Sequence, residues 1–332
     1  AAALVASLPP LDRATLPPRA GAALNEVVVW GYQLQRVTPS AIPDAVDLLI
    51  TDYSRDGTAG GAWTAAEVDA LRHRAAGKSR IVLAYLSIGE AETYRGYWHH
   101  YWRLSPPSWL GAENAAWRGN FAVRYWQSGW QKLIFDAAPD LFARVVARWI
   151  PTFAADTYLD RILAAGFDGV FLDKVDAYED WTAERPSAAG DMVRFVGAIA
   201  DYARTRKPGF LVVPQNAEDL LLDVSYLAKI DAVTKEDLYF GIAGDGKPNL
   251  PDDVAAAEAA LGRASTAGLP IFVVEYGDDP VMRQTVRKQA EVIGFRSLFA
   301  SRDLNQPPQL PTPGALPPET GPELPATPEA TR

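Results

Sequence analysis

Eight short segments rich in β-branched and aromatic residues recur along the chain, and amphipathic helical patterns separate them. Most of these segments are nearly continuous apolar runs, which is typical of parallel strands covered on both faces. The predicted strands are Val27–Gln33, Val46–Tyr53, Arg80–Glu90, Gly169–Asp176, Leu211–Asn216, Ala232–Tyr239, Ile271–Tyr276 and Phe295–Ser301. Eight strand–helix units in about 280 residues favour a (β/α)8 TIM barrel. A doubly wound open sheet is the alternative, but no Gly-x-Gly-x-x-Gly follows the first strand.

The expected helices carry start and stop signals. Thr64-Ala-Ala-Glu67 is a capping box that opens a helix running to about Gly77. Apolar positions at helical spacing, with Pro or Gly near the ends, predict three further helices. These are Ala188–Lys207, Pro251–Gly268 and Pro280–Gly294.

The barrel is predicted to occupy residues 26–303, flanked by two segments of different composition. Residues 304–332 contain nine prolines and no aromatic residue, which predicts a disordered Pro-rich tail. Residues 1–25 are rich in Ala, Leu and Pro, and the numbering starts at Ala. We interpret them as the remnant of an export leader, which predicts a secreted or periplasmic protein.

One connection, residues 91–150 after the third strand, is far longer than a usual βα loop. It holds seven of the ten tryptophans, at positions 98, 102, 109, 117, 126, 130 and 149. In a barrel this insertion leaves from the face on which active sites are built. The aromatic rings could stack on sugar rings, or they could pack the core of a subdomain.

Composition excludes several kinds of chemistry. The 332 residues include no Cys and three His, and the formal net charge is −9. Without Cys the chain can form neither a disulfide framework nor a thiol nucleophile. The acidic balance disfavours a nucleic-acid partner, and no apolar run approaches the ~18 residues of a membrane span. We therefore expect a soluble, monomeric protein with no metal and no other cofactor.

Acidic and amide side chains gather where the predicted strands end. They are Asp52, Glu90, Asp173, Asp176, Gln215, Glu236 and Glu275, on strands two to seven. Strand interiors disfavour such residues, so their placement indicates a site. Because side chains alternate along a strand, Asp173 shares a face with Phe171, and Glu236 shares one with Thr234. If both faces point inward, the two carboxylates meet at the barrel mouth.

Paired carboxylates at such a mouth suit the cleavage of a glycosidic bond. One must be ionised to attack or to activate water, and the other must be protonated to assist the leaving group. Neighbouring like charges make this division possible by raising one pKa. The purely structural alternative is that these acids cap helices or pair with Lys174, Lys235 and Arg296.

Three strings of the sequence resemble one family. They are Tyr85-Leu-Ser-Ile-Gly-Glu-Ala-Glu92, Gly166-Phe-Asp-Gly-Val-Phe-Leu-Asp-Lys-Val-Asp176 and Thr234-Lys-Glu-Asp237. They are similar to glycoside hydrolase family 114, the endo-α-1,4-polygalactosaminidases, over residues 26–303. The resemblance implies a (β/α)8 barrel whose catalytic acids, at the ends of strands four and six, correspond to Asp173 and Glu236. Lys174 stands where the family more often has Asn.

The resulting hypothesis is an exported glycosidase that cleaves within an α-linked galactosamine-type polysaccharide and retains anomeric configuration. Asp173 would be the nucleophile and Glu236 the general acid and base. The expected substrate-binding residues are Tyr32, Asp52, Tyr85, Glu90, Lys174, Asp176, Gln215, Glu275 and Tyr276. Two alternatives stay open: a glycosidase of other specificity that pairs Asp173 with Glu275, and a non-catalytic carbohydrate-binding or envelope barrel.

Overall fold

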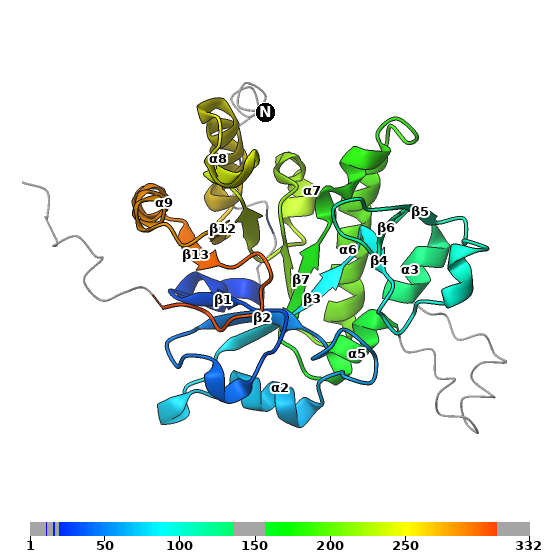
Figure 1. The fold of residues 1–332 in the computed structure, drawn as a ribbon, viewed down its shortest axis with the longest axis horizontal. Coiled ribbons are helices and arrows are strands. Elements are labelled where there is room, and N and C mark those ends of the chain that lie inside the picture. The colour runs from blue at the N-terminus through cyan, green and yellow to red at the C-terminus, as the bar shows by residue number, and fades with distance from the viewer. Residues whose placement is uncertain (1–10, 12–15, 17–19, 136–156, 311–332) are drawn as a thin grey trace, which may run out of the picture.

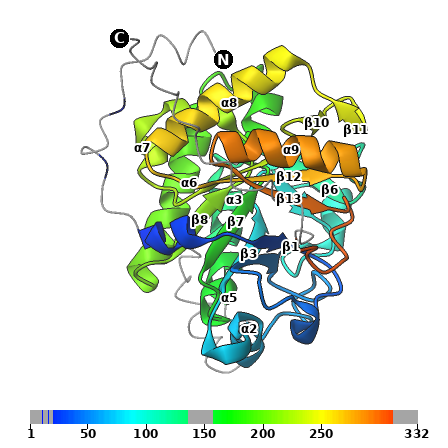
Figure 2. The ribbon, with the colours of Figure 1, turned by 90° about the vertical axis from the view of Figure 1, so that its left-hand side faces the viewer.

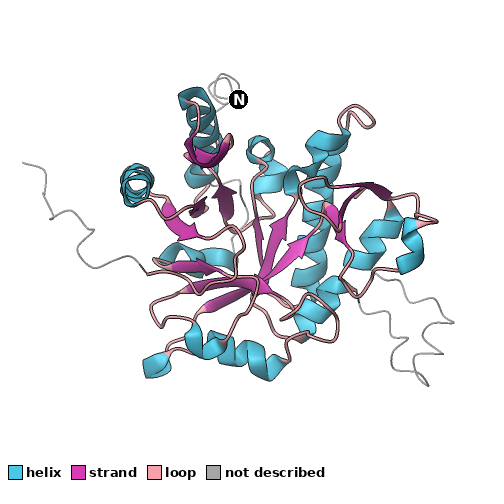
Figure 3. Cartoon of the chain, in the orientation of Figure 1, coloured by secondary structure: helices cyan, strands magenta, loops and turns pink. Residues whose placement is uncertain are grey.

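Eight parallel strands form the centre of the protein, as seen in a computed structural model that describes residues 11, 16, 20–135 and 157–310 (Figures 1 and 3). They are β1 (Trp30–Tyr32), β2 (Leu48–Asp52), β3 (Ile81–Ser87), β7 (Gly169–Asp173), β8 (Leu211–Pro214), β9 (Val233–Glu236), β12 (Ile271–Tyr276) and β13 (Arg296–Ala300). Each lies inside one of the eight segments predicted to be strands, so the strand prediction is confirmed.

Strand order follows chain order around the sheet. One ladder runs β1-β2-β3-β7-β8 and a second runs β9-β12-β13, with a bridge from Gln215 to Thr234 joining the two. Side-chain hydrogen bonds connect β13 to the β1 segment. The Trp30 indole donates to the Arg296 carbonyl at 3.1 Å, and the Arg296 guanidinium donates to the Val27 carbonyl at 2.6 Å. This order and direction confirm the (β/α)8 fold class.

Alternate residues of each strand point to opposite sides of the sheet. Tyr32, Ile50, Tyr85 and Phe171 belong to a small apolar cluster inside the barrel. The residues between them, such as Val170, pack outward in the large cluster under the helices. The faces that carry Asp173 and Glu236 therefore point inward, which is the condition for the two carboxylates to reach the barrel mouth.

Helices cover the outside of the strands (Figure 2). The α-helices of this layer are α2 (Ala65–Arg72), α5 (Tyr158–Ala164), α6 (Ala188–Arg206), α7 (Val224–Leu227), α8 (Pro251–Thr266) and α9 (Pro280–Val292). Short 3-10 helices are η2 (Ala20–Glu26), η3 (Pro39–Ala41), η4 (Ala75–Gly77), η5 (His100–Arg103), η7 (Val175–Trp181) and η8 (Glu218–Leu222). The predicted capping box of α2 is confirmed, but α2 ends at Arg72 because His73 has an extended backbone.

The long insertion is a subdomain on one side of the barrel (Figure 1). It contains an antiparallel sheet of β4 (Glu90–Glu92), β6 (Asn120–Val123) and β5 (Leu110–Glu113), followed by α3 (Ser128–Ile134). Trp98, Trp102, Trp109 and Trp130 are buried and follow one another at centroid distances of 5.0–5.3 Å. These four rings form the subdomain core.

Three tryptophans of the insertion differ from those four. Trp126 is partly buried against the large apolar cluster. Trp117 is 57% exposed, on the turn between β5 and β6, so it remains available for sugar stacking. Trp149 lies outside the described residues.

A second excursion at the barrel mouth is not among the predicted elements. After β9, the chain forms a hairpin of β10 (Phe240–Gly241) and β11 (Gly244–Pro248) before α8 begins. Gly241, Gly244 and Gly246 all have positive φ, which glycine adopts without a steric penalty. A hairpin this short and polar shows no apolar alternation from which it could be predicted.

Both predicted flanking segments overlap the fold, the first at residues 20–25 and the second at residues 304–310. Leu24 of η2 is fully buried at the barrel interior. Leu304 and Pro308 are also buried, and the amides of Leu34 and Gln35 donate to the Leu304 carbonyl. Residues 304–310 thus pack on the barrel beside β1, so the predicted disorder is wrong for these seven residues. Residues 1–10 and 311–332 lie outside the described structure.

Candidate active site

Asp173 is the last residue of β7 and lies at the inner face of the barrel mouth. The Tyr85 hydroxyl donates to its Oδ2 at 2.5 Å, and the Lys174 amide donates to its Oδ1 at 2.7 Å. Burial raises the pKa of Asp173 to about 7, and the negative charge of Glu236 adds to that rise. Asp173 therefore exchanges its proton near neutral pH.

Glu236 ends β9, two strands further around the barrel. The Asn216 amide donates to its Oε1 at 3.0 Å, and the Tyr276 hydroxyl donates to its Oε2 at 2.9 Å. Burial raises the pKa of Glu236 above its ordinary value, against these two hydrogen bonds, which lower it. The second carboxyl group is therefore partly buried and held by two hydrogen bonds, and its pKa is raised.

These two carboxyl groups form one electrostatic unit. Two strand spacings place their backbones about 10 Å apart, and both side chains are on inward faces of their strands. Tyr32 is buried among them: burial raises its pKa far above the usual value, and Tyr276, Asp173 and Glu236 raise it further. Carboxyl groups that interact in this way titrate as a pair and divide into an acid and a base.

Asp52 is at the mouth but is not free to bind a ligand. The two terminal nitrogens of Arg95 lie 2.8 Å from its two oxygens. The Arg95 Nε also donates to Glu92 at 2.6 Å. The Arg95 side chain is fully buried, so a charge-paired interior cluster occupies the end of β2 where a substrate-binding carboxylate is predicted.

Glu90, Lys174 and Asp176 lie along the side of the mouth that faces the insertion. Glu90 opens β4 rather than ending β3, and accepts from Asn114 at 2.7 Å and Asn120 at 3.1 Å. Lys174 has a left-handed backbone, and its Nζ is 3.6 Å from Asp176. Burial lowers the pKa of Lys174, but the carboxylates of Asp176 and Glu90 outweigh it, so this lysine is a cation.

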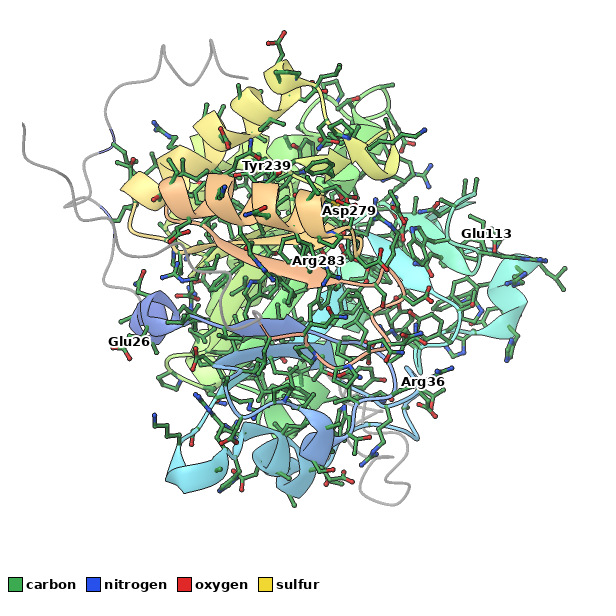
Figure 4. All side chains as sticks on the ribbon, turned by 60° about the vertical axis from the view of Figure 1, so that its left-hand side comes forward. Glu26, Arg36, Glu113, Tyr239, Asp279 and Arg283 are labelled. Carbon is green, nitrogen blue, oxygen red and sulfur yellow. The ribbon has the colours of Figure 1, made fainter. Side chains whose placement is uncertain are left out.

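Gln215 and Glu275 have different surroundings. Gln215 is buried in the bridge between β8 and β9. Glu275 is on the outward face of β12, where its carboxylate accepts from the amides of Tyr239 and Phe240, at 2.8 and 3.3 Å. Tyr239 is labelled in Figure 4. Glu275 therefore anchors the start of the β10–β11 hairpin, and this placement does not support its pairing with Asp173.

Three residues that contact the site are absent from the set predicted from the sequence. Asn216 adjoins the predicted Gln215, and its positive φ turns its amide toward Glu236. Arg95 stands three residues after Glu92, a spacing that permits a local ion pair. Arg302 lies 66 positions after Glu236 in a segment without a recognisable pattern, so only the tertiary structure identifies it.

Arg302 connects several parts of the mouth. Its guanidinium carbon is 4.2 Å from the centre of the Tyr276 ring. It donates to both oxygens of Asp237, at 3.1 and 3.0 Å, and to Asp245 of the hairpin. Tyr276 thus contacts Arg302 through its ring and Glu236 through its hydroxyl.

An acidic rim continues from the mouth along η7 and η8. Burial raises the pKa of Glu179, and the neighbouring charges of Asp176, Asp219 and Glu218 raise it further. Within the described residues, no group of three or more His, Asp or Glu side chains has a geometry that could hold a metal ion. The described helices include none long and apolar enough to cross a membrane.

A (β/α)8 barrel with two coupled carboxyl groups at the carboxyl ends of its strands is the architecture of a glycoside hydrolase. Comparison with known proteins agrees. The model of glycoside-hydrolase family GH114 matches residues 12–314, and the chain belongs to this family. An uncharacterized protein of Deinococcus radiodurans is 34% identical over 306 residues, covering 90% of this chain and 88% of the relative.

Two further comparisons extend this picture. An uncharacterized protein of Methanocaldococcus jannaschii is 34% identical over 283 residues, which cover 82% of this chain and 73% of the relative. Among solved structures, the glycoside hydrolase domain of PelA from Pseudomonas aeruginosa is similar with a TM-score of 0.58 and 16% identity. That match covers 84% of this chain and 96% of the PelA domain. At this identity the likeness concerns the fold.

Proposed function

We propose that this glycoside hydrolase cleaves within an α-linked galactosamine-type polysaccharide, with Asp173 and Glu236 as its catalytic pair. The observation that carries the proposal is the pair itself. Both groups are partly buried on the inward face of the barrel mouth, each accepts a hydrogen bond from a tyrosine hydroxyl, and each has a raised pKa. Asp52 also has a raised pKa, but both of its oxygens face the Arg95 guanidinium.

Retention of configuration gives the two groups distinct tasks. In the first assignment, Asp173 attacks the anomeric carbon, and Glu236 protonates the leaving oxygen and then deprotonates the incoming water. This mechanism needs carboxyl groups about 5–5.5 Å apart. The negative charge of Glu236 raises the pKa of Asp173, so the two groups interact. The separation of their oxygens decides between this mechanism and inversion.

The reverse assignment is favoured by one observation. The pKa of Asp173 rises to about 7, and the charge of Glu236 contributes to that rise. A raised pKa is typical of a general acid. In that case Asp173 would be the acid and Glu236 the nucleophile, and kinetics on variants of the two residues separates the two assignments.

The acidic rim supports a cationic substrate. Glu179 lies among Asp176, Asp219 and Glu218, and each of these carboxylates raises its pKa. They do so although Lys174 lies 3.6 Å from Asp176 and Lys235 lies 2.7 Å from Glu218. Ammonium groups of a de-acetylated galactosamine chain would relieve that repulsion. Neutral galactose polymers offer no such compensation. A polymeric substrate also predicts that the enzyme acts outside the cytoplasm.

A product assay tests the proposed reaction. The purified protein is incubated with α-linked polymers of galactosamine, N-acetylgalactosamine and galactose, and the released oligosaccharides are identified by mass spectrometry. We expect internal cleavage of the galactosamine polymer, weakened by added salt because ionic screening reduces steering. Cleavage of the N-acetylated polymer alone would contradict the cationic substrate.

Azide rescue separates the two role assignments. Asp173→Ala and Glu236→Ala variants are given an aryl glycoside with a good leaving group, with and without sodium azide. Azide replaces a missing nucleophile to give a glycosyl azide of inverted configuration, whereas rescue of a missing acid–base residue gives the retained anomer. The first assignment predicts the inverted product from Asp173→Ala. The reverse assignment predicts it from Glu236→Ala.

The non-catalytic barrel is the second candidate function. The exposed ring of Trp117 is the observation that favours it, because such a ring can bind glycan without chemistry. Glycan binding by the wild type, with no cleavage of any polymer tested, would favour this candidate over hydrolysis.

A further inference from the structure

Arg302 ties three segments of the barrel mouth together from a position outside the strands. It follows β13, stacks on Tyr276 of β12, forms a two-pronged contact with Asp237 beyond β9, and reaches Asp245 on β11. The fixed fork of a guanidinium holds a carboxylate in one orientation, which a lysine cannot reproduce. Tyr276 donates a hydrogen bond to Glu236, and Asp237 follows Glu236 in the chain. Asp245 belongs to the hairpin that comes next.

The backbone after Glu236 is built around this contact. Asp237 has a positive φ of 52°, a conformation that non-glycine residues adopt rarely. A Cβ on Gly241 would lie 2.3 Å from the Asp237 Oδ1. Glycine at 241 therefore leaves the space in which Asp237 meets Arg302, and the turn places Asp237 away from the strand.

Tyr276 carries the effect of Arg302 to the reacting group. Its ring is covered by the guanidinium, and its hydroxyl donates to the Glu236 Oε2 at 2.9 Å. A ring fixed on one face presents its hydroxyl in one direction. Without Arg302, both the ring and Asp237 lose a partner on the same side of Glu236.

We propose that Arg302 is a positioning residue that orients Glu236 through Tyr276 and Asp237 and links the β10–β11 hairpin to the reacting carboxyl group. The proposal rests on the proposed function of Glu236. Through Arg302 the hairpin would contribute to the active site, although neither catalytic carboxyl group belongs to the hairpin.

The charged and titratable groups around Glu236 determine how its titration responds. They are Lys235 and Asp237 on its own segment, Tyr276 from β12, Asp173 from β7, Tyr32 from β1 and Arg302 beyond β13. Removing the Arg302 cation leaves the charge of Asp237 uncompensated. That charge raises the pKa of Glu236, so loss of Arg302 should move the titration of Glu236 to higher pH.

Three variants test the proposal in steady-state kinetics. We expect Arg302→Ala to lower kcat about tenfold or more, because small misplacements of a reacting group are costly, with KM changed less. Arg302→Lys should restore the position of the pH profile, because it keeps the charge, but only part of kcat. The matched control is Arg124→Ala. Arg124, in the insertion, also stacks on an aromatic ring, that of Trp181, and contacts both oxygens of a carboxylate, Glu184. Its loss should leave kcat unchanged.

A second readout needs no turnover. Carbon-detected NMR of glutamate labelled at the carboxyl carbon follows the titration of Glu236, assigned with Glu236→Gln. An upward shift in Arg302→Ala that Arg302→Lys reverses would support the proposal. Wild-type kcat and an unchanged Glu236 titration in a folded Arg302→Ala protein would overturn it. If the wild type cleaves no polymer, the proposed function fails, but the titration still decides whether Arg302 controls Glu236.

Discussion

In both halves of the active site a tyrosine donates to the carboxyl group and an arginine lies near the tyrosine ring, but the surroundings differ. On the β7 side, Tyr85 donates to Asp173 and the Arg95 guanidinium lies 5.9 Å from the Tyr85 ring centre. On the β9 side, Tyr276 donates to Glu236 and Arg302 lies 4.2 Å from its ring. The guanidinium of each arginine contacts both oxygens of an aspartate at a strand end. The Arg95 side chain is fully buried, whereas that of Arg302 is 32% exposed.

This difference in burial predicts different roles: Arg95 mainly stabilises the fold, and Arg302 mainly orients Glu236. Arg95 neutralises Asp52 and Glu92 in the interior, and the rings of Tyr53, Tyr94 and Tyr158 surround it. Its loss would leave carboxylates unpaired where water cannot reach them. Arg302 joins an exposed hairpin, because the Asp245 side chain is 62% exposed. Water can replace part of that contact, so its loss should affect the geometry of Glu236 more than the stability of the fold.

The largest expected effect falls on the two carboxyl groups and should be equal on both sides. Asp173→Asn and Glu236→Gln should each reduce kcat about 10²–10⁴-fold, because each removes a group that transfers a proton or attacks. Initial rates on the cleaved polymer measure this. Glu113→Gln, at the outer edge of the insertion (Figure 4), is the control. A variant of either group with wild-type kcat would remove that side from the mechanism.

The next effect should differ strongly between the sides. Arg95→Met should destabilise the fold by about 3–5 kcal/mol, because breaking a buried pair leaves an uncompensated charge. Arg302→Met should cost only about 1 kcal/mol or less, as is usual for exposed pairs. Urea unfolding of both variants gives the two free energies. Equal losses would show that exposure does not distinguish the two arginines.

Removing a tyrosine hydroxyl should shift the pH dependence without unfolding the protein. The Tyr85 and Tyr276 hydrogen bonds lower the pKa of Asp173 and of Glu236, respectively. Tyr85→Phe and Tyr276→Phe should therefore each move one limb of the kcat/KM profile upward by about one pH unit. A downward shift would mean that the hydroxyl stabilises the protonated carboxyl instead.

The smallest effect concerns stability against pH. The pKa of Asp173 rises from an ordinary 3.8 to about 7 on folding, so the folded state holds a proton that the unfolded state has released. The stabilisation is complete below pH 3.8 and is lost as the pH rises through about 7. Urea unfolding between these limits should show a falling stability, with a shallower slope in Asp173→Asn.

Glu275 provides a comparison for that slope. Its pKa is also raised to about 7 by burial, against the backbone hydrogen bonds that lower it. Glu275→Gln should therefore reduce the same slope while leaving the catalytic pair in place. A slope unchanged by both substitutions would show that neither carboxyl group holds its proton in the folded state.

Local patterns carry much of this protein's architecture. Apolar runs placed all eight strands, and the alternation of side chains placed Asp173 on one face with Phe171 and Glu236 on one face with Thr234. These features depend on neighbours along the chain, which the sequence shows directly. The alternation could not decide the orientation of Glu275, because both faces of β12 are apolar and only contacts with α8 and the hairpin distinguish them.

The sequence by itself determined the barrel, the acidic strand ends and the two carboxyl groups, because strand period and residue chemistry are local properties. The tertiary structure decided which acids are free. Asp52 is neutralised by Arg95, 43 positions away, and Asp237 by Arg302, 65 positions away. Such pairs depend on where the insertion and the last loop return to the mouth, and the packing of the whole barrel determines that return.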